Sequence, residues 1–270
     1  MLFRSFQPSE VSKLILVIVL AKYFSQNFDY SNQFRVFARS LVYSLPAIVL
    51  VLIQPDLGTA IVLSSIWLVM TLATKVNKKY LVVMLLLFVV ALPLTYPRLH
   101  DYQRQRIKTF LDPSADPAGA GYNVNQAIIA TGSGGMFGQG LGSGGQSQGN
   151  FLPSSHTDFI FAVLAERLGF VGGLVTIALF VVVISRIVID GSRSQDRFGS
   201  LLCIGIATMF IVHVVVNIGM NLGIMPVTGI PLPFISAGGT SMMVSLVSIG
   251  IVLSVYAHRR GRELAKTEAS

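Results

Sequence analysis

Long apolar segments separated by short basic or polar stretches constrain this chain more than any other feature of its sequence. A helix needs about 20 apolar residues to cross a hydrocarbon core of ~30 Å. Seven segments approach or exceed that length: residues 8–25, 40–54, 57–74, 80–96, 158–188, 198–219 and 238–257. Only 12% of the residues are charged, against about 25% in a soluble domain. The sequence therefore predicts an all-α polytopic membrane bundle with about seven transmembrane helices, and it excludes a soluble globular enzyme.

Basic residues are concentrated at alternate ends of these segments. The connections on one side contain Lys22, Arg35, Arg39, Lys75, Lys78, Lys79, Arg186, Arg193, Arg197, Arg259, Arg260, Arg262 and Lys266. The positive-inside rule places this side, and with it the C-terminus, in the cytoplasm. The same distribution explains the formal net charge of +8 without a nucleic-acid partner.

A single membrane domain is expected over residues 1–257, followed by a basic cytoplasmic tail over 258–270. The outer loop at about 97–157 is far longer than ordinary connections, and loops of that length are usually functional or disordered. Seven crossings place the N-terminus outside, yet residues 1–8 contain no cleavable signal pattern. An external start without a signal predicts further helices upstream of Met1.

Asp158 lies where the outer loop enters the fifth apolar segment, within FLPSSHTDFIF at 151–161. An oxygen-bearing side chain here can cap the first turn of a helix, and Ser155 or Thr157 could serve as well. At the membrane surface beside His156, the carboxylate could instead act as a general base on a hydroxyl of a lipid-anchored substrate. The residues alone leave both interpretations open.

The fifth segment is longer than the membrane core. As one continuous helix, its 31 residues would span about 46 Å and protrude outward by a few turns. Glu166 and Arg167 would then lie about 12 Å below Asp158, near the outer boundary of the membrane. They would form an interfacial ion pair or snorkel, or Glu166 would border the same groove as Asp158.

Two further sets of charged residues allow both a structural and a functional interpretation. Glu10 and Lys13 are three residues apart on one predicted helix, where they would form a structural salt bridge or line a substrate cavity. Arg104, Arg106 and Lys108 lie in the outer loop. They would attract anionic headgroups nonspecifically, or they would hold a pyrophosphate through bidentate contacts.

Three other features carry weaker signals. The glycine run at 132–149 contains a G-x-G-x-x-G at 140–145, but it lacks the βαβ context of a dinucleotide site and is more typical of a flexible loop or a lid. Residues 217–241 are apolar yet broken by Pro and Gly, which predicts a re-entrant or cavity-lining element. Cys203 and His213 lack partners at metal-ligand spacing, so no metal site is predicted.

Six motifs, distributed in order over nearly the whole chain, resemble those of the SEDS family, which includes the RodA, FtsW and SpoVE proteins. They are QPSEVSK at 7–13, QPDLGTA at 54–60, FLDPSADPAGAGYNVNQA at 110–127, the glycine run, FLPSSHTDFIFAVLAERLG at 151–169 and GIMPVTGIPLPFISAGGTS at 223–241. The resemblance implies a peptidoglycan glycosyltransferase of the bacterial plasma membrane. Such an enzyme polymerises lipid II for cell elongation or division, together with a class B penicillin-binding protein.

The resemblance also implies that the chain lacks the first three of the ten helices usual in the family. QRI at 105–107 and QSQ at 146–148 favour the RodA branch. The family's essential acid, in the HTDF motif, corresponds here to Asp158. The chain departs from the family pattern at Arg167, where a second acid is common, and at Ala237, where Tyr is common.

The implied reaction needs few protein groups. A base must accept the proton of the acceptor hydroxyl, whereas the leaving pyrophosphate needs charge stabilisation more than a proton. Asp158 would be the base, and Arg104, Arg106 and Lys108 or a divalent ion would hold the pyrophosphate. No other cofactor is implied, and the apolar segments would hold the polyprenyl tails.

Two other functions are compatible with the sequence. A lipid II flippase would use Glu10 and Lys13 as an intramembrane gating pair. Inverted repeats would favour such a transporter, and no repeat is visible in the sequence. A noncatalytic scaffold of the elongation or division machinery would need no base at all.

Overall fold

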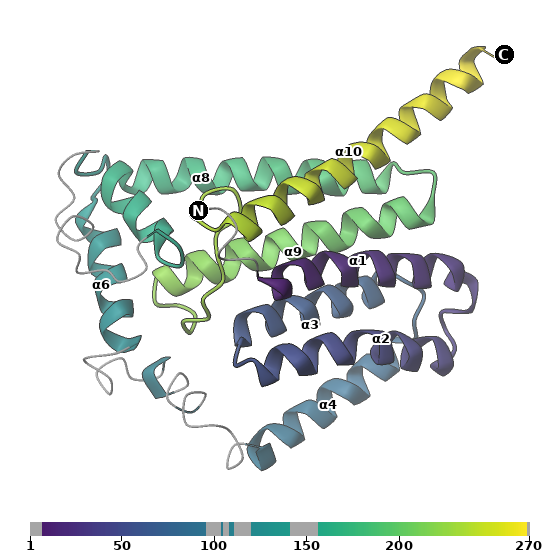
Figure 1. The fold of residues 1–270 in the computed structure, drawn as a ribbon, viewed down its shortest axis with the longest axis horizontal. Coiled ribbons are helices and arrows are strands. Elements are labelled where there is room, and N and C mark those ends of the chain that lie inside the picture. Colours follow the sequence, from purple (N-terminus) through teal and green to yellow (C-terminus); the bar gives the residue numbers. More distant parts are fainter. Residues whose placement is uncertain (1–6, 96–103, 105–107, 111–119, 141–155, 269–270) are drawn as a thin grey trace. The chain divides into compact units, whose positions relative to one another are not determined.

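The structure is a computed structural model that describes residues 7–95, 104, 108–110, 120–140 and 156–268 (Figure 1). Within these ranges it contains helices and no strands. The elements are α1 (Pro8–Gln26), the 3-10 helix η1 (Phe28–Tyr30), α2 (Phe34–Ile53), α3 (Leu57–Leu72), α4 (Lys78–Thr95), α6 (Ala120–Ser133), α8 (Ile160–Ser192), α9 (Arg197–Asn221) and α10 (Gly239–Glu268). The all-α prediction is confirmed.

Several of these helices are suited to a membrane. Four in the described part of the chain are long and apolar enough to cross one: Phe34–Ile53, Ile160–Ser192, Arg197–Asn221 and Gly239–Arg259. Leu57–Leu72 is apolar but shorter. Each of the seven predicted segments overlaps a helix. The largest difference at a helix start is in α2, which begins at Phe34 and not at the predicted residue 40. The prediction began too late because Arg35 and Arg39 interrupt the apolar pattern of the first turns.

The chain divides into two compact units. Unit 1 comprises Met1–Tyr80, Val181–Val212 and Gly238–Ser270. Unit 2 comprises Leu81–Phe180 and His213–Ala237. Both units therefore bring together segments that are far apart in the sequence.

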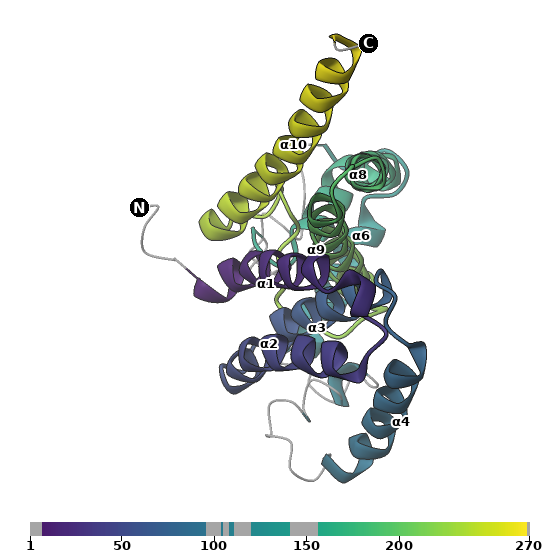
Figure 2. The ribbon, with the colours of Figure 1, turned by 90° about the vertical axis from the view of Figure 1, so that its right-hand side faces the viewer.

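Unit 1 is built around the first three helices, which Figure 2 shows side by side. Phe24 of α1 and Ile66 and Met70 of α3 are completely buried in this group. Gly205 of α9 packs closely against it, since a Cβ at this position would lie 2.6 Å from Cγ1 of Val17. Between membrane helices, close van der Waals packing of this kind stabilises the association.

Two cationic side chains lie over the ring of Phe28 at one end of unit 1. Cζ of Arg197 lies 4.4 Å and Nζ of Lys75 lies 5.4 Å from the centroid of the Phe28 ring. Nη1 of Arg197 also donates to the carboxylate of Asp29 at 3.2 Å. These contacts connect η1 to the start of α9, at an end that charge distribution predicts to be cytoplasmic.

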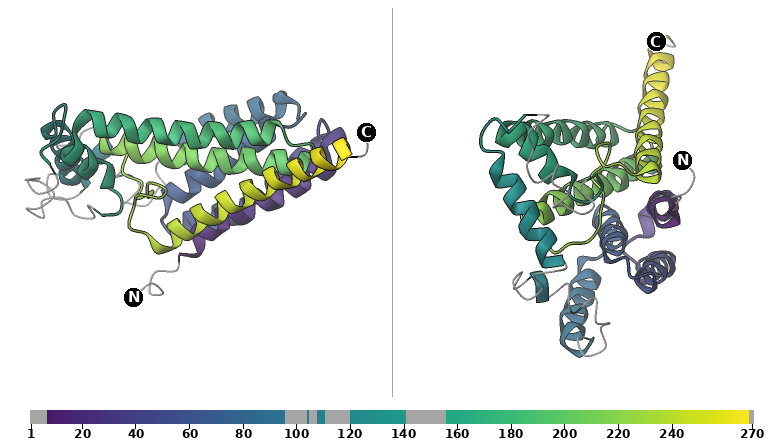
Figure 3. Two further views of the ribbon diagram at one scale, coloured as in Figure 1. Left: turned by 90° about the horizontal axis from the view of Figure 1, so that it is seen from above. Right: turned by 60° about the vertical axis from the view of Figure 1, so that its left-hand side comes forward.

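In unit 2, α6 packs against the first turns of α8 (Figure 3). Ala127 and Ala130 of α6 meet Phe159, Ala162 and Val163 in a buried apolar cluster. Small residues on α6 allow this close approach to α8. The cluster therefore supports the segment that leads from Asp158 into α8.

The fifth predicted segment is not one continuous helix from residue 158. Residues 156–159 form turns, α8 begins at Ile160, and Gly169 interrupts it with φ 69° and ψ −168°. This φ is in the left-handed region, which glycine adopts without the steric cost paid by other residues. The predicted single helix from residue 158, and the helical spacing it gave between Asp158 and Glu166, are therefore wrong, whereas the protrusion beyond the membrane stays a prediction.

Candidate active site

The main chain around Asp158 is held by hydrogen bonds to three successive carbonyl groups. Nδ2 of Asn217 and Nδ2 of Asn221 donate to the carbonyl of Asp158 at 3.0 and 3.2 Å. Oγ of Ser236 donates to the carbonyl of Thr157 at 2.7 Å. The amide of Ala237 donates to the carbonyl of His156 at 2.8 Å. The turn that carries Asp158 is thus fixed by both α9 and the segment before α10. We call residues 156–158 with these four donors the Asp158 frame.

Asn221 also serves the first turn of α8. Its Oδ1 accepts from the amide of Ala162 at 3.2 Å, so a side chain from α9 satisfies one of the free amides at the start of α8. Asn217 and Asn221 are both completely buried. Neither residue is among those predicted from the sequence. The available signal is the presence of two side-chain amides four residues apart in an apolar helix, where they are costly unless they form hydrogen bonds.

The segment between α9 and α10 passes beside the carboxylate. Its residues 222–238 are not helical, which confirms the predicted break, although 217–221 belong to α9 and 239–241 to α10. The re-entrant or cavity-lining role stays a prediction. Gly229 has φ 74°, and a Cβ built there would lie 3.6 Å from Oδ2 of Asp158. His213 is buried, and its Nδ1 lies 3.0 Å from the carbonyl of Pro231, which accepts the hydrogen bond. These contacts hold the segment next to Asp158.

The predicted site residues of unit 2 differ in their exposure. Asp158 is half-buried and His156 is exposed. Glu166 is completely buried, so it does not extend outward as a snorkelling side chain would. Arg104 is half-exposed and Lys108 exposed.

Arg106 lies outside the described residues. No group of three or more His, Cys, Asp or Glu side chains that could hold a metal ion occurs in the described ranges.

The first half of the glycine run closes the break in α8 by main-chain hydrogen bonds. The amides of Gln139 and Gly140 donate to the carbonyls of Glu166 and Arg167 at 3.0 and 3.1 Å. On the other side of the break, the amides of Phe170 and Val171 donate to the carbonyls of Gly135 and Met136 at 2.8 and 3.2 Å. Polar groups freed by the break are therefore paired. We call residues 134–140 the glycine clasp.

An apolar cavity of about 330 Å³ lies between α6, the glycine clasp and α8. Its walls include Phe161, Ala165, Gly173 and Ile177 of α8, and Leu222, which directly follows α9. Phe161 follows Asp158 closely in the chain, and Leu222 directly follows Asn221. An apolar cavity of this size can accommodate part of a hydrocarbon chain.

Unit 1 contains the other predicted pair. Nζ of Lys13 donates to Oε1 of Glu10 at 2.6 Å, and both residues are buried. The amide of the neighbouring Gln7 donates to Oγ1 of Thr240 at 3.2 Å. The predicted salt bridge is confirmed, whereas its alternative role in a substrate cavity stays a prediction.

This pair can be tested separately from any catalytic role. Breaking a buried pair leaves one charge uncompensated, so Lys13→Met should lower the free energy of unfolding by about 3 kcal/mol. The double variant Glu10→Leu with Lys13→Met should regain most of that stability. Fluorescence of Trp67, the only tryptophan and a residue of the same unit, can follow thermal unfolding. A stable double variant that no longer uses substrate would instead support the cavity interpretation.

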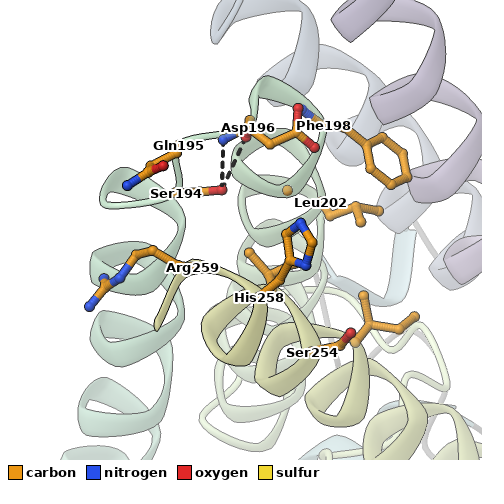
Figure 4. A pocket seen from close by; sticks show the side chains of 11 residues that line it. Ser194, Gln195, Asp196, Phe198, Leu202, Ser254, His258 and Arg259 are labelled. Atoms are coloured by element: carbon orange, nitrogen blue, oxygen red, sulfur yellow. Dashed lines mark hydrogen bonds between the residues drawn. The ribbon is translucent and has the colours of Figure 1, made fainter. Parts of the chain in front are cut away.

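A second cavity, of about 230 Å³, lies in unit 1 (Figure 4). Ser194 and Asp196 contribute from the connection between α8 and α9, and Ser254, His258 and Arg259 contribute from α10. None of the predicted site residues that the structure describes lines it. It lies at the end of unit 1 that the positive-inside rule assigns to the cytoplasm.

Comparison with known proteins gives one consistent family. A family profile described as "Cell cycle protein" and covering FtsW, RodA and SpoVE matches residues 2–261. The chain is 41% identical over 256 residues to "Peptidoglycan glycosyltransferase MrdB" of Escherichia coli K12, covering 94% of this chain and 69% of that protein. It is 39% identical over 264 residues to "Stage V sporulation protein E" of Bacillus subtilis, covering 95% of this chain and 70% of that protein.

Solved structures agree with the sequence relatives. The chain matches a protein from a study entitled "Structural coordination of polymerization and crosslinking by a peptidoglycan synthase complex" with a TM-score of 0.76 and 32% identity, covering 94% of this chain and 70% of that one. It matches the crystal structure of Thermus thermophilus rod shape determining protein RodA with a TM-score of 0.63 and 30% identity, covering 94% and 66%. With its apolar helices, the chain is a multi-pass membrane protein, and it belongs to the FtsW/RodA/SpoVE family.

Proposed function

We propose that this protein is a peptidoglycan glycosyltransferase that polymerises lipid II at the outer face of the bacterial plasma membrane. Its relative MrdB is named a peptidoglycan glycosyltransferase, and an FtsW relative carries the name "Probable peptidoglycan glycosyltransferase FtsW". Membership of the family supports the reaction class, and the Asp158 frame supports the site. The observation that carries the proposal is a half-exposed carboxylate on a main-chain turn held by four hydrogen bonds.

The chemistry requires one base and a stabilised leaving group. The acceptor hydroxyl oxygen forms a bond to the anomeric carbon of the donor sugar, and the bond from that carbon to the lipid pyrophosphate breaks. The hydroxyl proton passes to the carboxylate of Asp158. The pyrophosphate leaves with both electrons of the broken bond, so nearby cations lower the barrier.

Cations of the outer loop are the proposed partners of that pyrophosphate. Arg104, Arg106 and Lys108 can donate charge-assisted hydrogen bonds to phosphate oxygens. A divalent ion could supply the same charge. The apolar cavity beside α8 would receive part of a polyprenyl tail.

The cation assignment predicts a loss of substrate use. The triple variant Arg104→Gln, Arg106→Gln, Lys108→Gln should raise the KM for lipid II by about tenfold or more, since a hydrogen bond to a charged group is worth about 1.5–3 kcal/mol. Initial rates of polymerisation at varied lipid II would measure this.

A matched control removes the same amount of charge from the opposite side. Lys78→Gln, Lys79→Gln and Arg193→Gln change three exposed residues of the basic connections. Equal KM values for the two triple variants would mean that the cations of the outer loop interact only nonspecifically with lipid headgroups.

The proposed function also assigns the domain organisation, the partner and the branch of the family. Residues 1–257 would act as one membrane domain, with residues 258–270 as a cytoplasmic tail, of which the part up to Glu268 continues α10. A class B penicillin-binding protein would supply the transpeptidase, and the RodA branch is favoured by the sequence of the outer loop. The relative MrdB, at 41% identity, agrees with that branch.

A lipid II flippase is the second candidate function. The buried Glu10–Lys13 pair is the observation that favours it, because ionisable pairs inside membranes often mark transport pathways. A flippase would move lipid II without forming a glycosidic bond, so it would not need the basicity of Asp158.

A further inference from the structure

We infer that Asn217 and Asn221 are positioning residues that fix the direction in which Asp158 presents its carboxylate. The inference rests on the proposed function, because it concerns how the proposed base is held. Neither asparagine is proposed to touch substrate. Both would act through the carbonyl group of Asp158.

The geometry uses one carbonyl as an anchor for two donors. Nδ2 of Asn217 lies 3.0 Å and Nδ2 of Asn221 lies 3.2 Å from the carbonyl oxygen of Asp158. A carbonyl oxygen has two lone pairs, so these donors can satisfy it completely. Rotation of the peptide after Asp158 would break both bonds at once. The direction of the Cα–Cβ bond of Asp158 is thereby restricted.

The two amides are themselves fixed by further bonds. Nδ2 of Asn217 also donates to the carbonyl of Ile230 at 2.7 Å, and Nδ2 of Asn221 donates to the carbonyl of Asn217 at 2.8 Å. Both side chains are completely buried, where unmade bonds are costly and made bonds are rigid. This hydrogen-bond network thus connects the main chain at Asp158 to α9 and to the segment beside Gly229.

The two polar atoms of the Asn221 side chain have different roles, one structural and one in positioning Asp158. Its Oδ1 accepts from the amide of Ala162 at the start of α8, whereas its Nδ2 holds the carbonyl of Asp158. Aspartate at this position keeps an oxygen that can accept from the amide of Ala162. It loses the donor and sets a carboxylate oxygen against the carbonyl of Asp158, and burial of that carboxylate lowers the free energy of unfolding. Asn221→Asp therefore keeps the acceptor for α8 and removes the donor to Asp158, whereas Asn217→Ala removes a donor without adding a charge.

The test measures turnover of the full chain with its transpeptidase partner on purified lipid II. Asn221→Asp should lower kcat by about 10- to 100-fold, because a displacement of about 1 Å at a reacting group can cost about 100-fold in rate. KM for lipid II should stay within about twofold of wild type, since the loss is confined to the transition state. Asn217→Ala, which leaves the Ala162 cap in place, should lower kcat in the same direction.

Asn27→Asp is the matched control. Nδ2 of Asn27 donates to the carbonyl of Tyr23 at 2.9 Å, so the control removes the same kind of bond at the end of α1. Its kcat and KM should equal those of wild type. Thermal unfolding and detergent-solubilised yield would show whether each variant is folded.

Each other outcome overturns the inference. Wild-type kcat for Asn221→Asp, or a loss that only follows the fraction of folded protein, would leave the asparagines with a structural role. Failure of both Asn221→Asp and Asn217→Ala to fold would likewise assign them a structural role. Failure of the proposed function is seen separately in the same assay, as wild-type protein that forms no polymer. Failure of the base assignment is seen as normal polymerisation by Asp158→Asn.

Discussion

Asp158→Asn should give a folded, membrane-inserted protein that forms almost no glycan polymer from lipid II. Asparagine has the same shape, and the bonds that hold residues 156–158 end on main-chain carbonyls that the substitution leaves in place. What is lost is the ability to accept a proton, and loss of a general base typically costs ~10²–10⁴ in rate. Gel analysis of polymer made by the purified protein with its partner would measure the loss.

Asp196→Asn is a suitable control for this substitution. Asp196 precedes α9, and its Oδ1 accepts from the amide of Phe198 at 3.3 Å, so both variants replace an exposed or half-exposed acid near a helix start. Polymerisation by the control should equal that of wild type. Normal polymer length and yield from Asp158→Asn would remove the catalytic assignment, whereas lipid II translocation by wild type without any polymer would favour the flippase.

Gly138→Ala should separate the glycine clasp from α8. A Cβ at this position would lie 2.1 Å from the carbonyl oxygen of Arg167, and the residue has φ 81°, so no small adjustment relieves the overlap. We expect the clasped state to lose more than about 4 kcal/mol, at the upper end of single-residue effects. Hydrogen exchange at the amides of residues 139–140 and 170–171 should become fast, since these amides form the clasp.

Gly135→Ala provides a matched comparison within the same loop. Gly135 also has positive φ, 52°, but a Cβ there would meet nothing within 4 Å. This variant should cost only about 1–2 kcal/mol for the left-handed backbone. Equal protection of the four amides in the two alanine variants would mean that steric contact at residue 138 does not hold the clasp.

Helical segments could be predicted here because their signal is local. A run of apolar residues specifies a helix by composition, and the ends of α8 and α9 are marked by charge or by glycine. The end of α10 is not marked in this way, since the helix continues through the basic residues to Glu268. The position of Asp158 before α8 could be found for the same reason, since a polar residue at the start of an apolar run is conspicuous. Both features depend on residues close together in the chain.

The features that sequence analysis missed depend on residues far apart. Gly169 is one of several glycines near the start of α8, and its left-handed conformation is set by main-chain bonds to the glycine clasp about 30 residues earlier. Asn217 and Asn221 have amides that could bond to many groups, so their connection to Asp158 requires the folded chain. The charge of Glu166 favours the membrane boundary, whereas the folded chain buries this residue completely.

The four donors of the Asp158 frame bond only to main-chain carbonyl oxygens, which every residue type has. Whatever side chain stands at 156, 157 or 158 should therefore be displayed on the same main-chain platform. An inactive variant at 158 would then bind its substrate in the same orientation as the active protein, because the main chain around the site is unchanged. Such a variant is a natural trap for capturing the glycan chain and the lipid-linked sugar together in a single structure.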